Sequence, residues 1–203
     1  MITVIDYGVG NLFSLCSSLK YIGADVTVTS DAEQIRKADR IILPGVGAFA
    51  DAIDKLRSKG LDKVIKEEAA AGKDMMGICL GMQLLFEKSF EYGEHEGLGL
   101  LKGSVVPMEG NLPEGLKIPH IGWNQLEFTK DHRLLSKINE GDCVYFVHSY
   151  YAQDCDDSLI AATDYGRKIT AAVARDNVMG CQFHPEKSGK TGLAILRAFC
   201  EGE

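Results

Sequence analysis

The order of apolar segments predicts an α/β fold: an open, mostly parallel twisted sheet with helices on both faces and antiparallel strands in the second half. Two observations predict it. In the first half, short apolar strands alternate with helical segments, and repeated β-α-β units give parallel strands. In the second half, strand-like segments follow one another with few helices between them, so some of their pairing should be antiparallel.

The first half begins with an apolar strand at residues 2–6. Asn11 suits the N-cap of a helix that runs through Tyr21, and Gly23 suits its end. In chain order, the following segments are a strand at 25–29, a helix at 31–38, a strand at 40–43, helices within 49–57 and 61–71, a strand at 74–78, a turn at Cys79 and a helix over 81–89.

The second half contains six expected strands, near residues 103–106, 125–129, 143–148, 159–163, 170–175 and 178–184. A last helix is expected over 191–200. The stretch 107–122, which contains Pro and Gly, is interpreted as a surface excursion and not as a domain boundary. We therefore expect residues 1–203 to form a single domain.

Composition and charge narrow the function classes. Hydrophobic residues make up 45% of the chain and charged residues 25%, an ordinary mixture for a soluble protein. The net charge of −7 argues against a nucleic-acid footprint and against anionic membranes. No apolar run is long enough to cross a bilayer and no export signal is recognisable, so we expect a cytoplasmic protein.

The six cysteines, at positions 16, 79, 143, 155, 181 and 200, form no C-x-x-C pair. A zinc ribbon or a thioredoxin-type site is therefore not supported, and reduced thiols are the simplest interpretation. The sequence predicts neither a metal nor a cofactor.

The most informative segment is Gly-Ile-Cys-Leu-Gly at residues 77–81, which follows an apolar strand and opens a helix. It is the thiol counterpart of the Gly-x-Ser-x-Gly nucleophile elbow, in which small neighbours allow a sharp, strained turn. Such a turn exposes Cys79 at the carboxyl end of the sheet, where the helix N-terminus favours a thiolate. The N–H of Leu80 is then free to face a developing oxyanion.

The same turn is compatible with Cys79 as a small buried residue, and the segment alone does not favour either interpretation. A thiol nucleophile also needs a base and a group that orients the base. His184 and Glu186 suit these roles, because they follow the end of a predicted strand and are two residues apart, on one side of an extended chain. Pro185 favours extended geometry at His184.

A glycine-rich loop, Gly45-Val46-Gly47, follows the third strand. Such a loop can direct backbone N–H groups toward an oxyanion or a phosphate. It lacks the Lys-Ser/Thr ending of a P-loop, and the segment Tyr7–Asn11 lacks the third glycine of a dinucleotide loop.

Taken together, residues 77–83 and the His-Pro-Glu at 184–186 resemble the triad (class I) glutamine amidotransferases. Further motifs resemble one branch of that family, the glutaminase subunits of imidazole glycerol phosphate synthases, and match it in order over nearly the whole chain. These motifs are IDYGVGN at 5–11, LPGVGAF at 43–49, PHIGWN at 119–124, YFVHSY at 145–150 and HPEKS at 184–188.

The resemblance implies an activity and a partner. Cys79 would attack the side-chain amide of L-glutamine, His184 would protonate the ammonia and then activate water, and Glu186 would orient His184. The oxyanion donors would be Leu80 and the loop Gly45, Val46 and Gly47. The substrate-binding residues would be Gln83, Glu91, Ser149 and Tyr150. Ammonia would pass to a (β/α)8 cyclase subunit in a heterodimer, for imidazole glycerol phosphate formation in histidine biosynthesis.

Three other functions remain open at this point. One is a glutaminase subunit of another amidotransferase, which the Gly-Trp-Asn at 122–124 and the His-Pro-Glu-Lys-Ser at 184–188 disfavour. The second is a cysteine hydrolase of similar fold, which would not need the distal His-x-Glu pair. The third, a non-catalytic binding module, would differ from all of these in lacking a thiol that a glutamine-mimicking electrophile labels.

Overall fold

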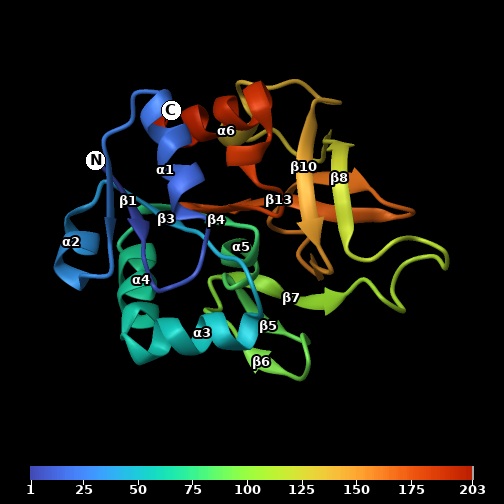
Figure 1. Cartoon of the computed structure of the whole chain (residues 1–203), viewed down its shortest axis with the longest axis horizontal. Helices are drawn as coiled ribbons and strands as arrows, with labels where there is room; N and C mark the ends of the chain where they lie inside the picture. The colour runs from blue at the N-terminus through green and yellow to red at the C-terminus, as the bar shows by residue number, and fades with distance from the viewer. Residues whose placement is uncertain (203) are drawn as a thin grey trace.

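The computed structural model describes residues 1–202, and its centre is an eight-stranded sheet in the order β2-β1-β3-β4-β14-β13-β12-β9 (Figure 1). In that order the strands are Val26–Thr29, Ile2–Ile5, Arg40–Leu43, Asp74–Ile78, Val178–Cys181, Lys168–Arg175, Leu159–Asp164 and Glu127–Phe128. The strands from β2 to β14 are parallel, whereas β13, β12 and β9 pair antiparallel. The predicted fold class is confirmed.

Helices cover both faces of this sheet (Figure 1). One face carries α1 (Leu12–Tyr21) and α6 (Gly189–Glu201). The other carries α2 (Ala32–Lys37), α3 (Phe49–Ser58) and α4 (Leu61–Ala70). Along β3, Ile41 and Leu43 join the hydrophobic cluster beneath α3 and α4, while Ile42 joins the cluster beneath α1 and α6. Both faces of β3 are thus buried, as in parallel sheets generally.

Two smaller sheets flank the main one. The first has the order β11-β7-β5-β6, with strands Tyr150–Gln153, Leu101–Pro107, Phe86–Ser89 and His95–Glu96. The second is an antiparallel ribbon of β10 (Cys143–His148) and β8 (His120–Gln125), beside the antiparallel end of the main sheet (Figure 1). The short helices are α5 (Leu80–Gln83) and the 3-10 turns Arg133–Leu135 and Pro185–Lys187.

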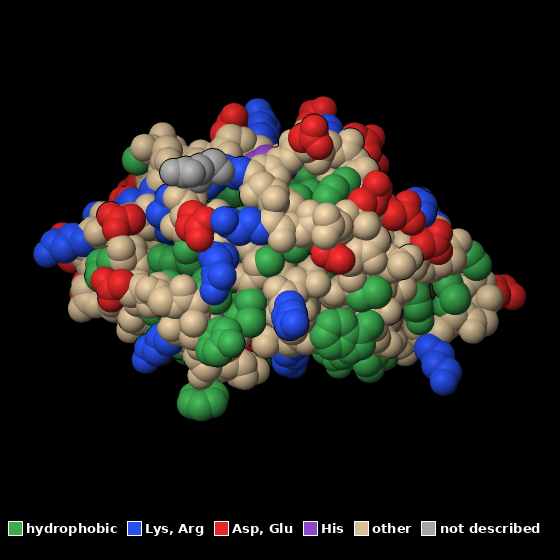
Figure 2. Space-filling model, turned by 90° about the horizontal axis from the view of Figure 1, so that it is seen from above, with side chains coloured by type: hydrophobic (Ala, Val, Ile, Leu, Met, Phe, Trp, Pro, Cys, Tyr) green, Lys and Arg blue, Asp and Glu red, His purple; other side chains and the backbone are tan. Residues whose placement is uncertain are grey.

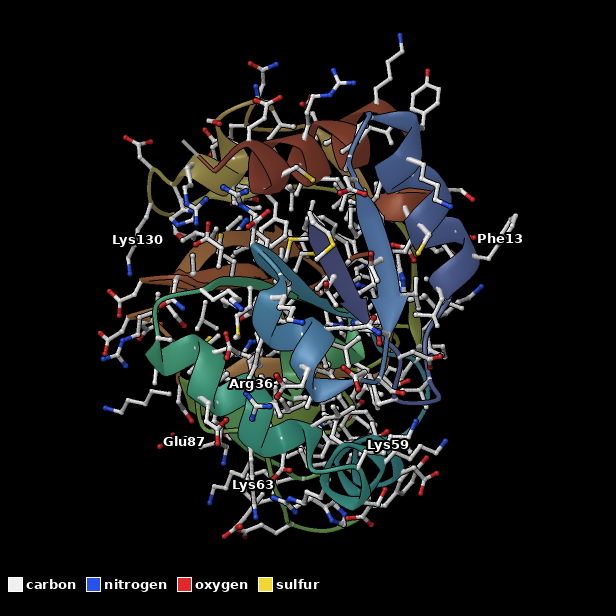
Figure 3. The ribbon with its side chains drawn as sticks, turned by 90° about the vertical axis from the view of Figure 1, so that its left-hand side faces the viewer. Phe13, Arg36, Lys59, Lys63, Glu87 and Lys130 are labelled. Atoms are coloured by element: carbon white, nitrogen blue, oxygen red, sulfur yellow. The ribbon has the colours of Figure 1, made fainter. Side chains whose placement is uncertain are left out.

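Local capping agrees with the sequence prediction for α1, because the Asn11 side chain accepts a hydrogen bond from the N–H of Ser14. At the edge of the molecule, Arg36 of α2 extends to α4 and forms an ion pair with Glu67 at 2.9 Å (Figure 3). Phe13 projects from α1 with 83% of its surface exposed (Figure 3). The face above α1 and α6 carries interspersed acidic and basic side chains (Figure 2).

The helix predicted over 81–89 is wrong. Only Leu80–Gln83 is helical, and Phe86–Ser89 forms β5, which pairs parallel with β7 and antiparallel with β6. Leu84, Leu85 and Phe86 are all buried, so this segment has no solvent-facing stripe for a longer helix. Its partners in β6 lie six to eight residues away and those in β7 about fifteen, so the pairing is not visible in the segment itself.

Other boundaries also differ from the prediction. The strand expected over 178–184 ends at Cys181, and the excursion expected over 107–122 ends where β8 begins at His120. The strand expected over 125–129 is divided between β8 and β9. Strands β6 and β11 were not predicted. Within residues 1–202, no helix is long and apolar enough to cross a membrane.

Candidate active site

Cys79 lies on a strained turn between β4 and α5. Its backbone angles are φ 54° and ψ −112°, a conformation that residues other than glycine rarely adopt. The Cys79 N–H donates to the carbonyl of Cys181 at 2.8 Å, which ties the turn to β14. The expected strain at this residue is present. Because α5 is a single turn, its dipole favours a thiolate less than a longer helix would.

Small residues around the turn are required by close backbone contacts. A Cβ on Gly77 would lie 2.5 Å from the carbonyl oxygen of Gly81, and a Cβ on Gly81 would lie 1.9 Å from that of Leu43. The turn therefore packs backbone against backbone on the segment that follows β3. This explains the two glycines that flank the cysteine in the sequence.

His184 reaches the same edge of the sheet, because β14 is the parallel neighbour of β4. Its backbone N–H donates to the carbonyl of Tyr145 at 3.0 Å, and its carbonyl accepts from the Ser188 hydroxyl at 2.7 Å. The Ser188 oxygen also accepts from the Tyr145 N–H at 2.9 Å. These bonds fix the position of the imidazole through β10.

Glu186 lies behind His184, with its Oε1 2.8 Å from Nδ1, and both side chains are buried. The expected pairing is present, but its geometry differs from an extended strand: His184 is extended and Glu186 lies in a 3-10 turn that begins at Pro185. Burial lowers the pKa of His184, but hydrogen bonds to the Cys79 sulfur and the Glu186 carboxylate outweigh it and raise the pKa to about 9. The imidazole is therefore protonated at neutral pH.

A cavity of about 570 Å³ opens above these groups. Most of the predicted site residues line it, namely Val46, Gly47, Cys79, Leu80, Gln83, Glu91, Ser149, Tyr150 and His184. Glu186 does not line it, since it lies behind His184. Gly45 does not line it either, because its Cα packs against the turn, where an added Cβ would lie 2.7 Å from the Gly81 nitrogen.

The loop after β3 is anchored from beneath. The Tyr7 hydroxyl donates to the Pro44 carbonyl at 2.7 Å, and Tyr7 is only 1% exposed. Burial, with a contribution from Cys79, raises the pKa of Tyr7, so the phenol stays a proton donor. Val46 and Gly47 face the cavity and are exposed, and Gly47 has φ +96°.

The expected substrate-binding residues line the cavity from three places: Gln83 ends α5, Glu91 lies in the β5–β6 loop, and Tyr150 begins β11. The Glu91 Oε2 accepts from the Phe49 N–H at 2.5 Å, and this bond joins the β5–β6 loop to the first turn of α3. Burial raises the pKa of Glu91. The Gln83 Nε2 donates to the Tyr150 carbonyl at 3.1 Å. Ser149 precedes β11.

Some residues of the site were not predicted. Gln182 is fully buried, and its Nε2 lies 3.7 Å from the Cys79 sulfur. Glu109, Ile118 and Lys187 line the cavity from loops. Gln182 precedes the His-Pro-Glu motif and is two residues from His184, which is the signal that identifies it. Loop residues such as Glu109 carry no such pattern.

Within residues 1–202, no group of three or more His, Cys, Asp and Glu side chains is arranged to hold a metal ion. All six cysteines lie in this range and are free thiols. Cys155 is buried with 4% exposure and contacts the Thr170 hydroxyl.

Comparison with known proteins defines the class to which this fold and cavity belong. The family model described as glutamine amidotransferase class-I matches residues 3–201. Two solved structures share the fold. PurLQS from Thermotoga maritima matches with a TM-score of 0.78 at 22% identity, over 99% of this chain and 97% of that chain. A protein described as a glutamine amidotransferase matches with a TM-score of 0.77 at 18% identity, over 99% of this chain and 98% of that chain. The chain belongs to the class-I glutamine amidotransferase family.

Full-length relatives place it more narrowly. The imidazole glycerol phosphate synthase subunit HisH of Caldanaerobacter subterraneus subsp. tengcongensis is 55% identical over 99% of this chain and 98% of its own. The subunit of the same name from Lactococcus lactis subsp. lactis is 52% identical, over 98% of this chain and 98% of its own. The one from Aquifex aeolicus is 51% identical, over 97% of this chain and 94% of its own. Within the family, the chain groups with the HisH subunits, which confirms the resemblance drawn from the motifs.

Proposed function

We propose that this chain hydrolyses L-glutamine to L-glutamate and ammonia, with Cys79 as nucleophile, His184 as acid and base, and Glu186 as the group that orients His184. The observation that carries the proposal is the convergence of a strained cysteine turn and a buried His–Glu pair, which follow adjacent parallel strands, at one 570 Å³ cavity. As a HisH subunit, the chain supplies this ammonia to imidazole glycerol phosphate synthase in histidine biosynthesis.

The first half-reaction begins with the Cys79–His184 pair. A thiolate at Cys79 attacks the amide carbon of glutamine, and the carbonyl π electrons move to the oxygen. Protonated His184 then gives its proton to the amide nitrogen, the C–N bond breaks, and ammonia leaves a thioester on Cys79. The raised pKa of His184 suits this step, because the imidazolium already holds the proton at neutral pH.

The second half-reaction uses His184 as a base. The imidazole, now neutral, takes a proton from water, which attacks the thioester carbon. Collapse of this intermediate breaks the C–S bond and releases glutamate and the thiolate. Glu186 holds Nδ1 through its 2.8 Å contact, so that Nε2 is the nitrogen that exchanges the proton.

Backbone N–H groups stabilise the oxyanion in both steps. Leu80 follows the nucleophile directly and lines the cavity, and its N–H has no protein acceptor among residues 1–202. Val46 and Gly47 are placed on the cavity wall to supply a second donor. Gly45 contributes by allowing close packing on the turn, although its own N–H was expected to be a donor. One oxyanion donor contributes about 3 kcal/mol to transition-state stabilisation.

Gln83, Glu91, Ser149 and Tyr150 would hold the amino-acid end of glutamine. The support is that all four residues line the cavity, together with the chemistry of Glu91. A carboxylate with one oxygen bound to the Phe49 N–H keeps its other oxygen for an ammonium group. A bound ammonium would favour the charged form of Glu91 against the effect of burial.

The partner would be the (β/α)8 cyclase subunit, in a heterodimer. Ammonia would pass through a tunnel and join a phosphoribosyl formimino intermediate, giving imidazole glycerol phosphate and an aminoimidazole carboxamide ribotide. Exposed apolar side chains support a docking face: Ile118 lines the cavity at 40% exposure, and Ile121 and Trp123, in the strand β8 that follows it, are 58% and 55% exposed. The whole chain would act as one glutaminase domain in the cytoplasm.

The test uses the chain copurified with this cyclase. The parent should form glutamate and the ring product from glutamine, whereas Cys79→Ala should form the product only from added ammonium salt. A Cys79→Ala complex that still uses glutamine would disprove the assignment of the nucleophile. A parent chain that forms no complex with the cyclase, but hydrolyses glutamine, would instead favour another amidotransferase or a hydrolase.

A further inference from the structure

Gln182 makes two polar side-chain contacts in the interior, although no solvent reaches it. Its Nε2 lies 3.7 Å from the Cys79 sulfur, and its Oε1 accepts a hydrogen bond from the Gln83 Nε2 at 2.9 Å. Gln182 and His184 are two residues apart and both reach the thiol, whereas Phe183 between them belongs to the hydrophobic core. The Cys79 sulfur therefore has two partners, the titratable imidazole of His184 and the neutral amide of Gln182.

A backbone carbonyl fixes which end of the Gln182 amide faces the sulfur. The Tyr150 carbonyl can only accept, so the end of Gln83 that faces it, at 3.1 Å, must be the NH₂ group. The second hydrogen of that NH₂ group points to Gln182, which must present its oxygen. The remaining end of Gln182, at Cys79, is then the NH₂ donor.

A fixed donor at this place distinguishes the two forms of the nucleophile. A thiol sulfur is a weak acceptor, whereas a thiolate accepts charge-assisted hydrogen bonds. The donor end of the bond is buried, because Gln182 has no exposed surface, and a hydrogen bond in such a place is stronger than one in water. Together with the His184 contact, it restricts the side-chain rotation of Cys79.

We propose that Gln182 is a positioning residue for the nucleophile: its amide donates to the Cys79 thiolate, stabilises it and directs the sulfur toward the substrate carbon. The inference rests on the proposed function, because it assigns a task only if Cys79 is the nucleophile. It adds a neutral donor to the His184 contact.

A simpler role for Gln182 would be to hold Gln83 for substrate binding. Two substitutions separate the roles. Gln182→Glu keeps an oxygen for the Gln83 Nε2 but replaces the donor at the sulfur by a second oxygen. Gln182→Met keeps the length of the side chain and removes both polar contacts. The matched control is Gln34→Glu, the same chemical change at an exposed position on α2.

The full chain is assayed in complex with its synthase partner. Both Gln182 variants should lose about ten- to a hundredfold in kcat, the size expected for a hydrogen bond to a charged acceptor. KM should stay at the parent value in Gln182→Glu, which keeps an oxygen for Gln83. Alkylation of Cys79 by iodoacetamide, which does not need the glutamine subsite, should slow as well. Gln34→Glu should match the parent in both measurements.

The pH profile of Gln182→Glu gives a readout that a packing defect would not produce. When protonated, the introduced carboxyl group donates its O–H to the sulfur, as the amide does. When ionised, it repels the thiolate. The ratio of the variant's kcat/KM to the parent's should therefore fall as the pH rises from about 6 to about 9. The pH dependence of Gln182→Glu still tests the proposed role of Gln182 if Gln182→Met does not fold.

The proposal is overturned if Gln182→Glu keeps the parent kcat at all pH values, or if both variants act through KM alone. Such results would leave the proposed function intact, because Cys79→Ala would still abolish glutamine use. Conversely, a Cys79→Ala variant that remains active would remove the proposed function first, whatever the Gln182 variants show.

Discussion

His184 Nδ1 lies 2.8 Å from Glu186 Oε1, and each of the two side chains is less than 5% exposed. The contact directs the opposite ring nitrogen to Cys79 and contributes to a His184 pKa of about 9. The imidazolium state at neutral pH thus depends on two neighbours, and the two can be removed one at a time.

Replacing Glu186 by Gln keeps the size of the side chain and removes its charge. The pKa of His184 should fall, because burial then acts with less opposition. Turnover requires the imidazolium as acid, so the parent should lose activity as the pH rises through about 9. In Glu186→Gln this loss should begin at lower pH, and kcat at pH 7 should fall about tenfold or more. Rates of glutamate formation across pH measure both effects, and an unshifted alkaline limb would contradict this role of Glu186.

The strained backbone at Cys79 predicts an effect on stability. A residue with φ 54° and ψ −112° costs about 1–3 kcal/mol unless it is glycine. Both Cys79→Ala and Cys79→Gly should be inactive with glutamine, but Cys79→Gly should have a free energy of unfolding about 1 kcal/mol higher than Cys79→Ala. Urea titrations of the two variants compare them directly. Equal stabilities would indicate that the turn is not strained.

Gly81→Ala tests the close approach of the turn to β3. The added methyl group would lie 1.9 Å from the Leu43 carbonyl oxygen, so backbone must move. We expect a loss of about 3 kcal/mol or more in the free energy of unfolding. Gly72→Ala is the control for an added methyl group without a clash, because no atom lies within 4 Å of a Cβ added there, although Gly72 has a φ of +85° that Gly81 does not share. The free energy of unfolding of Gly72→Ala should fall by only about 1–2 kcal/mol.

His148 should make the fold sensitive to acid. Burial lowers its pKa to about 3, although its Nδ1 bonds the Tyr150 carbonyl at 2.8 Å. The unfolded chain takes up this proton near pH 6.5 and the folded chain does not, so stability is lost as the pH falls below 6.5. At pH 5 the loss amounts to about 2 kcal/mol.

The measurement is urea unfolding of the parent and of His148→Gln between pH 7.5 and 5. The variant is expected to be less stable at pH 7.5 but to lose less on acidification. His120 and His132 also have lowered pKa values through burial, so some loss should remain in both proteins. A variant with the same pH dependence as the parent would rule out His148 as a source of the sensitivity.

Signals that are local in the sequence predicted their part of the structure well. The turn at Cys79 needs two glycines within two residues, and the Asn11 cap acts within one helical turn. Strand β5 could not be predicted, because Phe86–Ser89 favours a helix locally and becomes a strand only by pairing with β7 and β6. The position of Gln182 two residues before His184 was a local signal, but its partners Gln83 and Cys79 lie about a hundred residues away, so its contacts could not be predicted.

The central claim is that Cys79 is the one catalytic thiol among six free cysteines. Labelling with a glutamine-mimicking electrophile, followed by mass spectrometry of the digested chain, tests it most directly. We expect one equivalent of label, on Cys79 alone, with protection by glutamine and no labelling of Cys79→Ala. Label on the exposed Cys143, or incorporation into Cys79 that glutamine does not slow, would contradict the claim.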